Sequence, residues 1–197
     1  MKKTSIFILI IFLTLTAFTN VEMSDRRITE YKVASSEKKI EVDSVLINGI
    51  PFSLKINKGV LDSISGLELN QENVYSLCVL LGIQFPDIVT KQAVIESGNF
   101  KSQLTTRGNN LFGMRRATRR PTTSSKKILF GYATYSNWTH SVIDYYIWQS
   151  QMIKKYPVKS DYFSWLKSRN YFGVSLAVYK KHVNGVKLKN IKTKVNQ

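Results

Sequence analysis

The stretch that decides the fold is PDIVTKQAVIESG, residues 86–98. It predicts one helix, because Pro86 suits the first position of a helix and Asp87 lies beside its positive end. Gly98 is the residue type that ends a helix. The rest of the chain is interpreted outward from this helix.

One carboxylate lies on the wrong face of this helix. At 100° per residue, Gln92 and Glu96 fall inside the apolar arc, while Thr90 and Lys91 mark the solvated face. Glu96 also lies in the last turn, where the helix dipole opposes a negative charge by roughly 0.3–1 kcal/mol. Burial and dipole both favour the protonated carboxyl, which is the form that a general acid needs. A structural ion pair with a nearby Arg or Lys is the alternative interpretation.

Helical periodicity continues on both sides of residues 86–98. Asn70 as N-cap and Gly82 after Leu81 bound a helix that carries Cys78 on its apolar stripe, where a buried, inert thiol is expected. Further helices are predicted from residue 137 to about 155, from 161 to 169 and from 175 to 183. The chain is therefore mostly helical.

The segments between and before these helices predict β-structure. Residues 99–137 lack helical periodicity, so we expect a loop and a two-stranded hairpin that turns near Arg119-Arg120-Pro121. Residues 21–69 are interpreted as a linker and a small β-rich extension with a hairpin signal at Asn48-Gly49, which Pro51 weakens. Residues 186–197 are predicted to be a frayed basic tail.

The first twenty residues predict export. Met1-Lys2-Lys3 precedes a thirteen-residue apolar run, residues 6–18, which suits a secretory signal and is short for a membrane span. We expect a signal peptide over residues 1–20 and a periplasmic, cell-envelope or secreted protein. No A-x-A pattern marks a cleavage site, so an uncleaved anchor, and with it membrane contact, is the alternative. A single Cys allows no intramolecular disulfide.

The charge distribution points to an anionic partner. The 197 residues carry a net charge of +16, and 43% apolar content excludes a disordered chain. Residues 96–197 hold nineteen basic and three acidic side chains, so the excess lies in the second half. Nucleic acid, anionic lipid and acidic wall polymers all fit this charge. A solvated basic hairpin is the alternative for the cluster of Arg residues at 115–120.

Three segments together resemble the glucosaminidase family, glycoside hydrolase family 73. They are QAVIESGNFKS (residues 92–102), NNLFGM (109–114) and YATYSNW (132–138). Members are similar to lysozyme, so the resemblance implies a mostly α, α+β fold with an α-rich lobe and a small β-hairpin lobe, here over residues 70–185. It also implies cleavage of the β-1,4 bond after N-acetylglucosamine in peptidoglycan.

The resemblance assigns roles by position. It implies that Glu96 is the catalytic acid and that Tyr135 lies near the scissile sugar. The substrate-binding residues that we expect are Ser97, Asn109, Asn110, Phe112, Gly113 and Tyr132. For several of these residues a structural role is the alternative: the asparagines would bind backbone and Tyr135 would pack. A place in the core is favoured over a sugar platform for Tyr132, Trp138 and Trp148. No cofactor is expected, and the isolated His140 and His182 give no metal-ligand spacing.

A second carboxylate is hard to find in this sequence. Many members carry a Glu on the β-hairpin, but residues 97–143 contain no Asp or Glu. Asp144, Asp161 and the segment before Glu96 remain as sources, and Asp144 is expected to be structural or ion-paired. We therefore hypothesise that the 2-acetamido group of the substrate acts as nucleophile after Glu96 protonates the leaving oxygen, with Tyr135 orienting that group or the water.

Three other functions compete with this hypothesis. A lytic transglycosylase has the same fold and one catalytic Glu, but in place of NNLFG those enzymes tend to have a Gly-Leu-Met-Gln run. A catalytically inactive wall-binding domain would explain the missing carboxylate. A nucleic-acid-binding protein with the Arg cluster as its footprint is the third, and it is not expected, because the predicted signal peptide removes the chain from the cytosol and no nucleic-acid motif accompanies the basic residues. Peptidoglycan strands, with other anionic wall polymers as an extension, are the expected partners.

Overall fold

The computed structural model describes residues 44–47, 50–53, 58–153, 158–189 and 191. The chain divides into two compact units, residues 1–39 and 40–197, and all described residues belong to the second. The predicted signal peptide, much of the predicted linker and the end of the basic tail therefore lie outside the described residues. In the part that the structure describes, no helix is long and apolar enough to span a bilayer.

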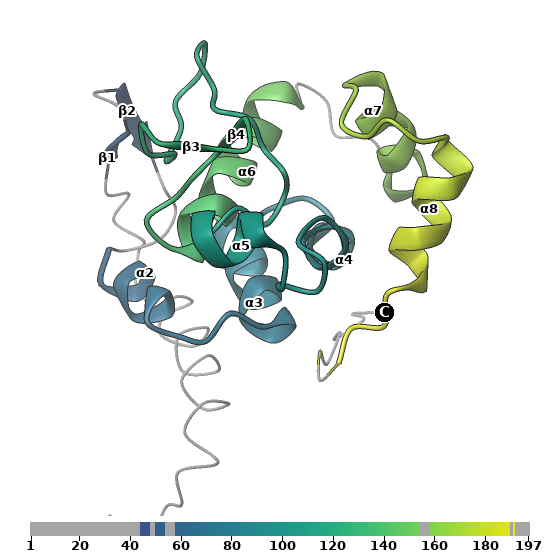
Figure 1. The fold of residues 1–197 in the computed structure, drawn as a ribbon, viewed down its shortest axis with the longest axis horizontal. Coiled ribbons are helices and arrows are strands. Elements are labelled where there is room, and N and C mark those ends of the chain that lie inside the picture. Colours follow the sequence, from purple (N-terminus) through teal and green to yellow (C-terminus); the bar gives the residue numbers. More distant parts are fainter. Residues whose placement is uncertain (1–43, 48–49, 54–57, 154–157, 190, 192–197) are drawn as a thin grey trace, which may run out of the picture. The chain divides into compact units, whose positions relative to one another are not determined.

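The described chain is mostly helical with two small antiparallel sheets (Figure 1), which confirms the predicted α+β, mostly α fold. The helices are α2 (Lys58–Ser65), α3 (Gln71–Leu81), α4 (Pro86–Glu96), α5 (Gln103–Gly108), α6 (Trp138–Met152), the 3-10 helix η1 (Lys159–Asp161), α7 (Tyr162–Ser168) and α8 (Leu176–Gly185). The strands are β1 (Ser44–Ile47), β2 (Ile50–Ser53), β3 (Ile128–Leu129) and β4 (Tyr132–Ala133).

The helix from the opening stretch, α4, packs against α3 on one side and α8 on the other (Figure 1). Helix α3 also packs against α6, so these helices share one core. Cys78 lies fully buried in it, as predicted. Burial removes apolar surface from water at roughly 25 cal/mol per Å², which is the main stabilising contribution of such a core. The core therefore fixes the end of α4, where Glu96 lies.

The helix boundaries follow their caps closely. Asn70 accepts a hydrogen bond from the backbone N–H of Asn73 at 2.9 Å, and Gly82 ends α3 in the left-handed conformation with φ 70°. Asn137 caps α6 and Ser175 caps α8 in the same way as Asn70. These polar residues satisfy backbone N–H groups that a helix start leaves unpaired.

The two hairpins test the turn predictions. β1 pairs antiparallel with β2 across residues 48–49, so the Asn-Gly signal is confirmed, and Pro51 is accommodated opposite Leu46. The second hairpin turns at Phe130-Gly131, because Leu129 pairs with Tyr132. The predicted turn near Arg119-Arg120-Pro121 is therefore wrong. Both turn residues have positive φ, 53° for Phe130 and 82° for Gly131, and an exposed Phe is an unusual choice for such a position.

Three further details differ from the sequence-based expectation. The segment 99–137 contains a short helix, α5, capped by the Ser102 side chain, and α2 lies at the end of the predicted linker. Thr90 is fully buried instead of solvated, because its hydroxyl donates to the carbonyl of Pro86 at 2.7 Å and so needs no water. The basic tail begins with a contact, since the Lys189 N–H donates to Gln71 Oε1 at 3.0 Å.

Candidate active site

Glu96 is the last residue of α4 and lies one turn after Gln92 on the same face. The Tyr179 hydroxyl on α8 donates to Glu96 Oε1 at 2.9 Å, and Gln92 Nε2 donates to the Tyr179 oxygen at 3.2 Å. Gln92 is fully buried and Glu96 is half-buried. The structure thus places the carboxylate where the helical pattern predicted it, against a neighbouring helix and not in open solvent.

The surroundings of Glu96 act on its pKa in opposite directions. Burial, the larger effect, raises the pKa of the Glu96 carboxyl, and the hydrogen bond from Tyr179 lowers it. Burial and the nearby carboxylate both raise the pKa of Tyr179, so Tyr179 keeps its proton and serves as a donor. The net upward direction favours a carboxyl that still carries its proton when a glycosidic oxygen arrives.

The turn directly after Glu96 is strained. Gly98, Asn99 and Phe100 have φ of 58°, 57° and 64°, which is the left-handed region for three successive residues. Ser97 holds this turn, because its buried Oγ accepts from the Phe100 N–H at 2.8 Å. Backbone strain at such a place suggests a functional constraint. The predicted substrate residue Ser97 therefore binds backbone, and it fixes the turn that directly follows Glu96.

A cleft of about 910 Å³ opens beside Glu96. Among the described residues that line it, Glu96 is the one acidic residue, whereas three arginines and one histidine do so: Arg115, Arg120, Arg169 and His182. Phe112, Gly113 and Tyr132, all predicted to bind substrate, line the same cleft. The cleft combines one protonatable carboxyl with positive charge and aromatic surface, which fits an anionic glycan.

The two predicted asparagines bind backbone. Asn110 is buried, with Nδ2 donating to the carbonyls of Met114 and Ala133, both at 2.9 Å, and Oδ1 accepting from the N–H groups of Phe112 and Met114. Asn109 ends α5 with φ 53° and donates to the carbonyl of Tyr135 at 3.0 Å. Neither lines the cleft. Both asparagines hold the cleft floor in place, as the structural alternative proposed.

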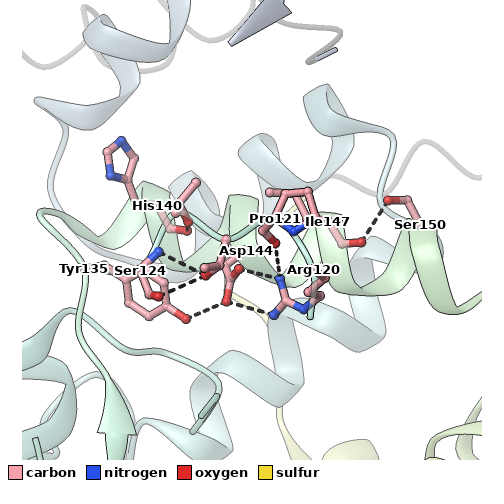
Figure 2. Close-up of polar contacts among 10 residues, drawn as sticks. Arg120, Pro121, Ser124, Tyr135, His140, Asp144, Ile147 and Ser150 are labelled. Carbon is pink, nitrogen blue, oxygen red and sulfur yellow. Dashed lines mark hydrogen bonds and ion pairs between the residues drawn. The ribbon is translucent and has the colours of Figure 1, made fainter. Parts of the chain in front are cut away.

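Tyr135 is not brought to the cleft. It is 4% exposed, does not line the cleft, and donates its hydroxyl to Asp144 Oδ2 at 2.8 Å. Arg120 donates to the same carboxylate from two nitrogens, Nη1 to Oδ1 at 2.6 Å and Nη2 to Oδ2 at 3.1 Å (Figure 2). Burial and Asp144 raise the pKa of Tyr135, so the hydroxyl remains a donor. The expectation for Asp144 as an ion-paired residue is confirmed, and its pairing occupies the hydroxyl of Tyr135.

Trp138 and Trp148 have different surroundings. Trp138 is buried in the core, as predicted, and donates Nε1 to the Leu67 carbonyl at 3.1 Å. Trp148 packs against Tyr145 and Trp165 but also lines the cleft, so it has a core side and a cleft side.

The two histidines lie apart. The His140 Nδ1 hydrogen-bonds Ser136 Oγ at 2.7 Å, and His182 lies at the cleft. Within the described ranges, no three His, Cys, Asp or Glu side chains come together as a metal-binding group.

The sequence from Tyr171 to Tyr179 loosely resembles the closing, tyrosine-containing segment of the family, but sequence reasoning gave no site role to the residues of α7, α8 and their connection. Tyr179 binds Glu96 directly, and Tyr171 and Arg169 line the cleft. The Tyr171 hydroxyl is buried and has no hydrogen-bond partner among the described residues. The signal was present in the tyrosines at 171 and 179, but their distance of 75 residues or more from Glu96 hid the contact.

Comparison with known proteins gives one match. The family model Glucosaminidase, described as mannosyl-glycoprotein endo-beta-N-acetylglucosaminidase, matches residues 72–193, more than half of the chain. The matched range contains α4, the cleft and the tyrosines of the C-terminal helices. No curated protein and no solved structure matches the chain.

Proposed function

The chain belongs to the glucosaminidase family and is a glycoside hydrolase, an endo-β-N-acetylglucosaminidase, and from this premise we propose that Glu96 is its general acid in the cleavage of peptidoglycan. The observation that carries the proposal is the position of Glu96, which is the one acid among the described residues that line a basic cleft and whose pKa is raised by burial. A protonated carboxyl there can donate its proton to the leaving glycosidic oxygen.

The proposed reaction needs no second carboxylate. As Glu96 protonates the leaving oxygen, the 2-acetamido oxygen of the substrate attacks C1, and the bond between C1 and the leaving oxygen breaks. The attack forms an oxazolinium ring. Water then adds to C1 and opens this ring, returns a proton to Glu96 and leaves a reducing N-acetylglucosamine end. This route is supported by Asp144, which is fully buried and paired with Arg120. It is further supported by Asp161, which does not line the cleft.

Export is part of the proposal and rests on the sequence alone. Met1-Lys2-Lys3 and the apolar run after it support a signal segment over residues 1–20, followed by the linker and extension over 21–69, the enzyme domain over 70–185 and the basic tail over 186–197. Peptidoglycan lies outside the cytoplasm, so the substrate and the signal segment agree with each other.

Product analysis tests the proposal. Mass spectrometry of peptidoglycan digested by the wild-type enzyme is expected to show reducing N-acetylglucosamine ends, and Glu96→Gln is expected to release roughly 10²–10⁴ times less product. Glu68→Gln is the matched control, because Glu68 is exposed and lies away from the cleft.

Two results would contradict the proposal in different ways. Anhydro-muramyl ends would show a lytic transglycosylase, which can also act with a single acid. Wall binding without any release of ends would show an inactive binding domain.

A further inference from the structure

A continuous chain of hydrogen bonds runs through the protein interior to Glu96. It links α6, the start of α7, α8 and α4. Its members are buried, with exposed fractions of 4% or less for all except Glu96 itself: Gln149, Tyr162, Tyr145, Gln92 and Tyr179. Buried polar groups that satisfy one another are held rigidly, because water cannot replace a lost partner.

The direction of this chain is fixed where it begins. The Gln84 backbone N–H donates to Gln149 Oε1 at 2.8 Å, and Gln149 Nε2 donates to the Gln84 carbonyl at 3.2 Å. A backbone N–H can only donate and a carbonyl can only accept, so the Gln149 amide has one allowed orientation. Its second Nε2 hydrogen goes to the Tyr162 oxygen at 2.9 Å.

The geometry of the bond between the Tyr162 and Tyr145 oxygens, 2.7 Å apart, allows either to donate. The Tyr162 oxygen already accepts from Gln149, and the Tyr145 oxygen is the acceptor that satisfies the single Tyr162 proton. Tyr145 then gives its own proton to Gln92 Oε1 at 3.2 Å. Gln92 is thereby oriented with Nε2 toward the Tyr179 oxygen at 3.2 Å. The Tyr179 proton remains for Glu96 Oε1 at 2.9 Å. Every bond in the chain points toward the carboxylate.

The direction decides which oxygen of Glu96 carries the acid proton. If the Gln92 amide were reversed, its Oε1 would take the Tyr179 proton, and Glu96 would have to donate its own proton to the Tyr179 oxygen. With the observed direction, Oε1 is an acceptor in both protonation states. The transferable proton is then held on Oε2.

We propose that Gln92, Tyr145 and Tyr162 are positioning residues for the acid: they orient Tyr179 as a donor to Glu96 Oε1 and so keep the transferable proton on Oε2. The inference rests on the proposed role of Glu96. Titratable groups that face Glu96 from packed elements are Tyr179 on α8 and Tyr171 before it. The other charged and titratable groups among the described residues that line the cleft are Arg115, Arg120, Arg169, His182 and Tyr132.

Tyr145→Phe tests the inference, because it keeps the ring and removes one hydroxyl. Gln92 Oε1 loses its donor, the amide is free to turn and take the Tyr179 proton, and Glu96 loses a hydrogen bond that favours its ionised form. The Glu96 pKa then rises, so the basic limb of the kcat/KM profile moves to higher pH by about 0.5–1 unit. We expect kcat to fall about three- to tenfold with KM unchanged.

A double-mutant cycle separates this role from a general loss of packing. In a Tyr179→Phe background the path to Glu96 is already cut, so adding Tyr145→Phe is expected to cause no further shift of the basic limb. Tyr75→Phe removes a hydroxyl on α3 that does not belong to this chain of hydrogen bonds, and it is expected to keep the wild-type pH profile. If the two shifts add, Tyr145 acts by another route and the inference is wrong.

The outcomes distinguish the inference from the function on which it rests. An active Glu96→Gln enzyme overturns both. An inactive Glu96→Gln enzyme together with a wild-type pH profile in Tyr145→Phe overturns the inference alone. Should Tyr145→Phe not fold, Gln92→Met removes the amide that donates to the Tyr179 oxygen, so that this oxygen is free to accept the Glu96 proton. This variant is expected to shift the basic limb in the same direction, and an unchanged profile there counts against the inference equally.

Discussion

Asp144 accepts hydrogen bonds from Arg120 and Tyr135 in the interior, whereas Glu96 accepts its hydrogen bond from Tyr179 at the edge of a cleft. Both carboxylates lie on helices, Glu96 on α4 and Asp144 on α6, and both turn toward the protein rather than toward open solvent. The Arg120 guanidinium balances the negative charge of Asp144, and the pair holds the loop of Arg120 against α6. We call Asp144 the anchor for this reason. Among the described residues, no cation forms an ion pair with Glu96, and burial raises the pKa of its carboxyl. The donors around a carboxylate therefore separate a structural role from a reactive one.

Removing the anchor should produce the largest change in stability. Asp144→Ala leaves Arg120, 10% exposed, as an uncompensated buried cation. We expect a loss of about 3–5 kcal/mol in the free energy of unfolding, measured by urea denaturation. Asp87→Ala is the comparison, because the Lys159–Asp87 pair is solvent-exposed and is expected to contribute about 1 kcal/mol or less. Equal losses in the two variants would contradict the role of Asp144 as an anchor.

Tyr135→Phe should cause a smaller effect of the same kind. The variant removes one hydrogen bond to Asp144 and leaves the Arg120 contacts in place. We expect about 1–2 kcal/mol of lost stability, with kcat/KM per folded molecule close to that of the wild type. A large loss of kcat at unchanged stability would instead place the Tyr135 hydroxyl in the reaction, as the family resemblance implied.

The smallest effect concerns the charge of the cleft. Arg169 is exposed, lies over the Trp165 ring at 5.9 Å and lines the cleft. Arg169→Gln is expected to raise KM for peptidoglycan about threefold at low salt, with the difference fading at high salt. Arg119→Gln is the matched control, because this exposed Arg does not line the cleft. An equal rise of KM in both variants would mean that overall charge, not the cleft, attracts the substrate.

Local sequence patterns were sufficient to predict the main helices and the unusual position of Glu96. Caps such as Asn70 and Gly82 and the misplaced polar pair Gln92 and Glu96 are readable within a few residues, because they follow from helix geometry. Sequence alone also predicted that Asp144 would be paired. The pattern did not supply its partner, since Arg120 is 24 residues away and belongs to an irregular loop.

The rest depended on contacts between distant segments. Tyr179 contacts Glu96, which lies 83 residues earlier in the sequence. The chain of hydrogen bonds that leads to Tyr179 joins four helices, and no local period of the sequence encodes such contacts. The hairpin turn was misplaced because Phe130 occupies a left-handed position that Asn or Gly normally takes, so the usual turn signal is missing. Family resemblance placed Tyr135 near the sugar, whereas its hydroxyl is held by Asp144.

The most direct test of the central claim compares Glu96→Gln with Asp144→Asn on purified peptidoglycan. The measurement is the initial rate of release of reducing ends per folded molecule, at a temperature where circular dichroism shows both variants folded. We predict that Glu96→Gln loses activity by roughly 10²–10⁴-fold while Asp144→Asn stays within about tenfold of the wild type. A folded Asp144→Asn enzyme with a loss as large as that of Glu96→Gln would contradict the account, because Asp144 would then be the second catalytic carboxylate.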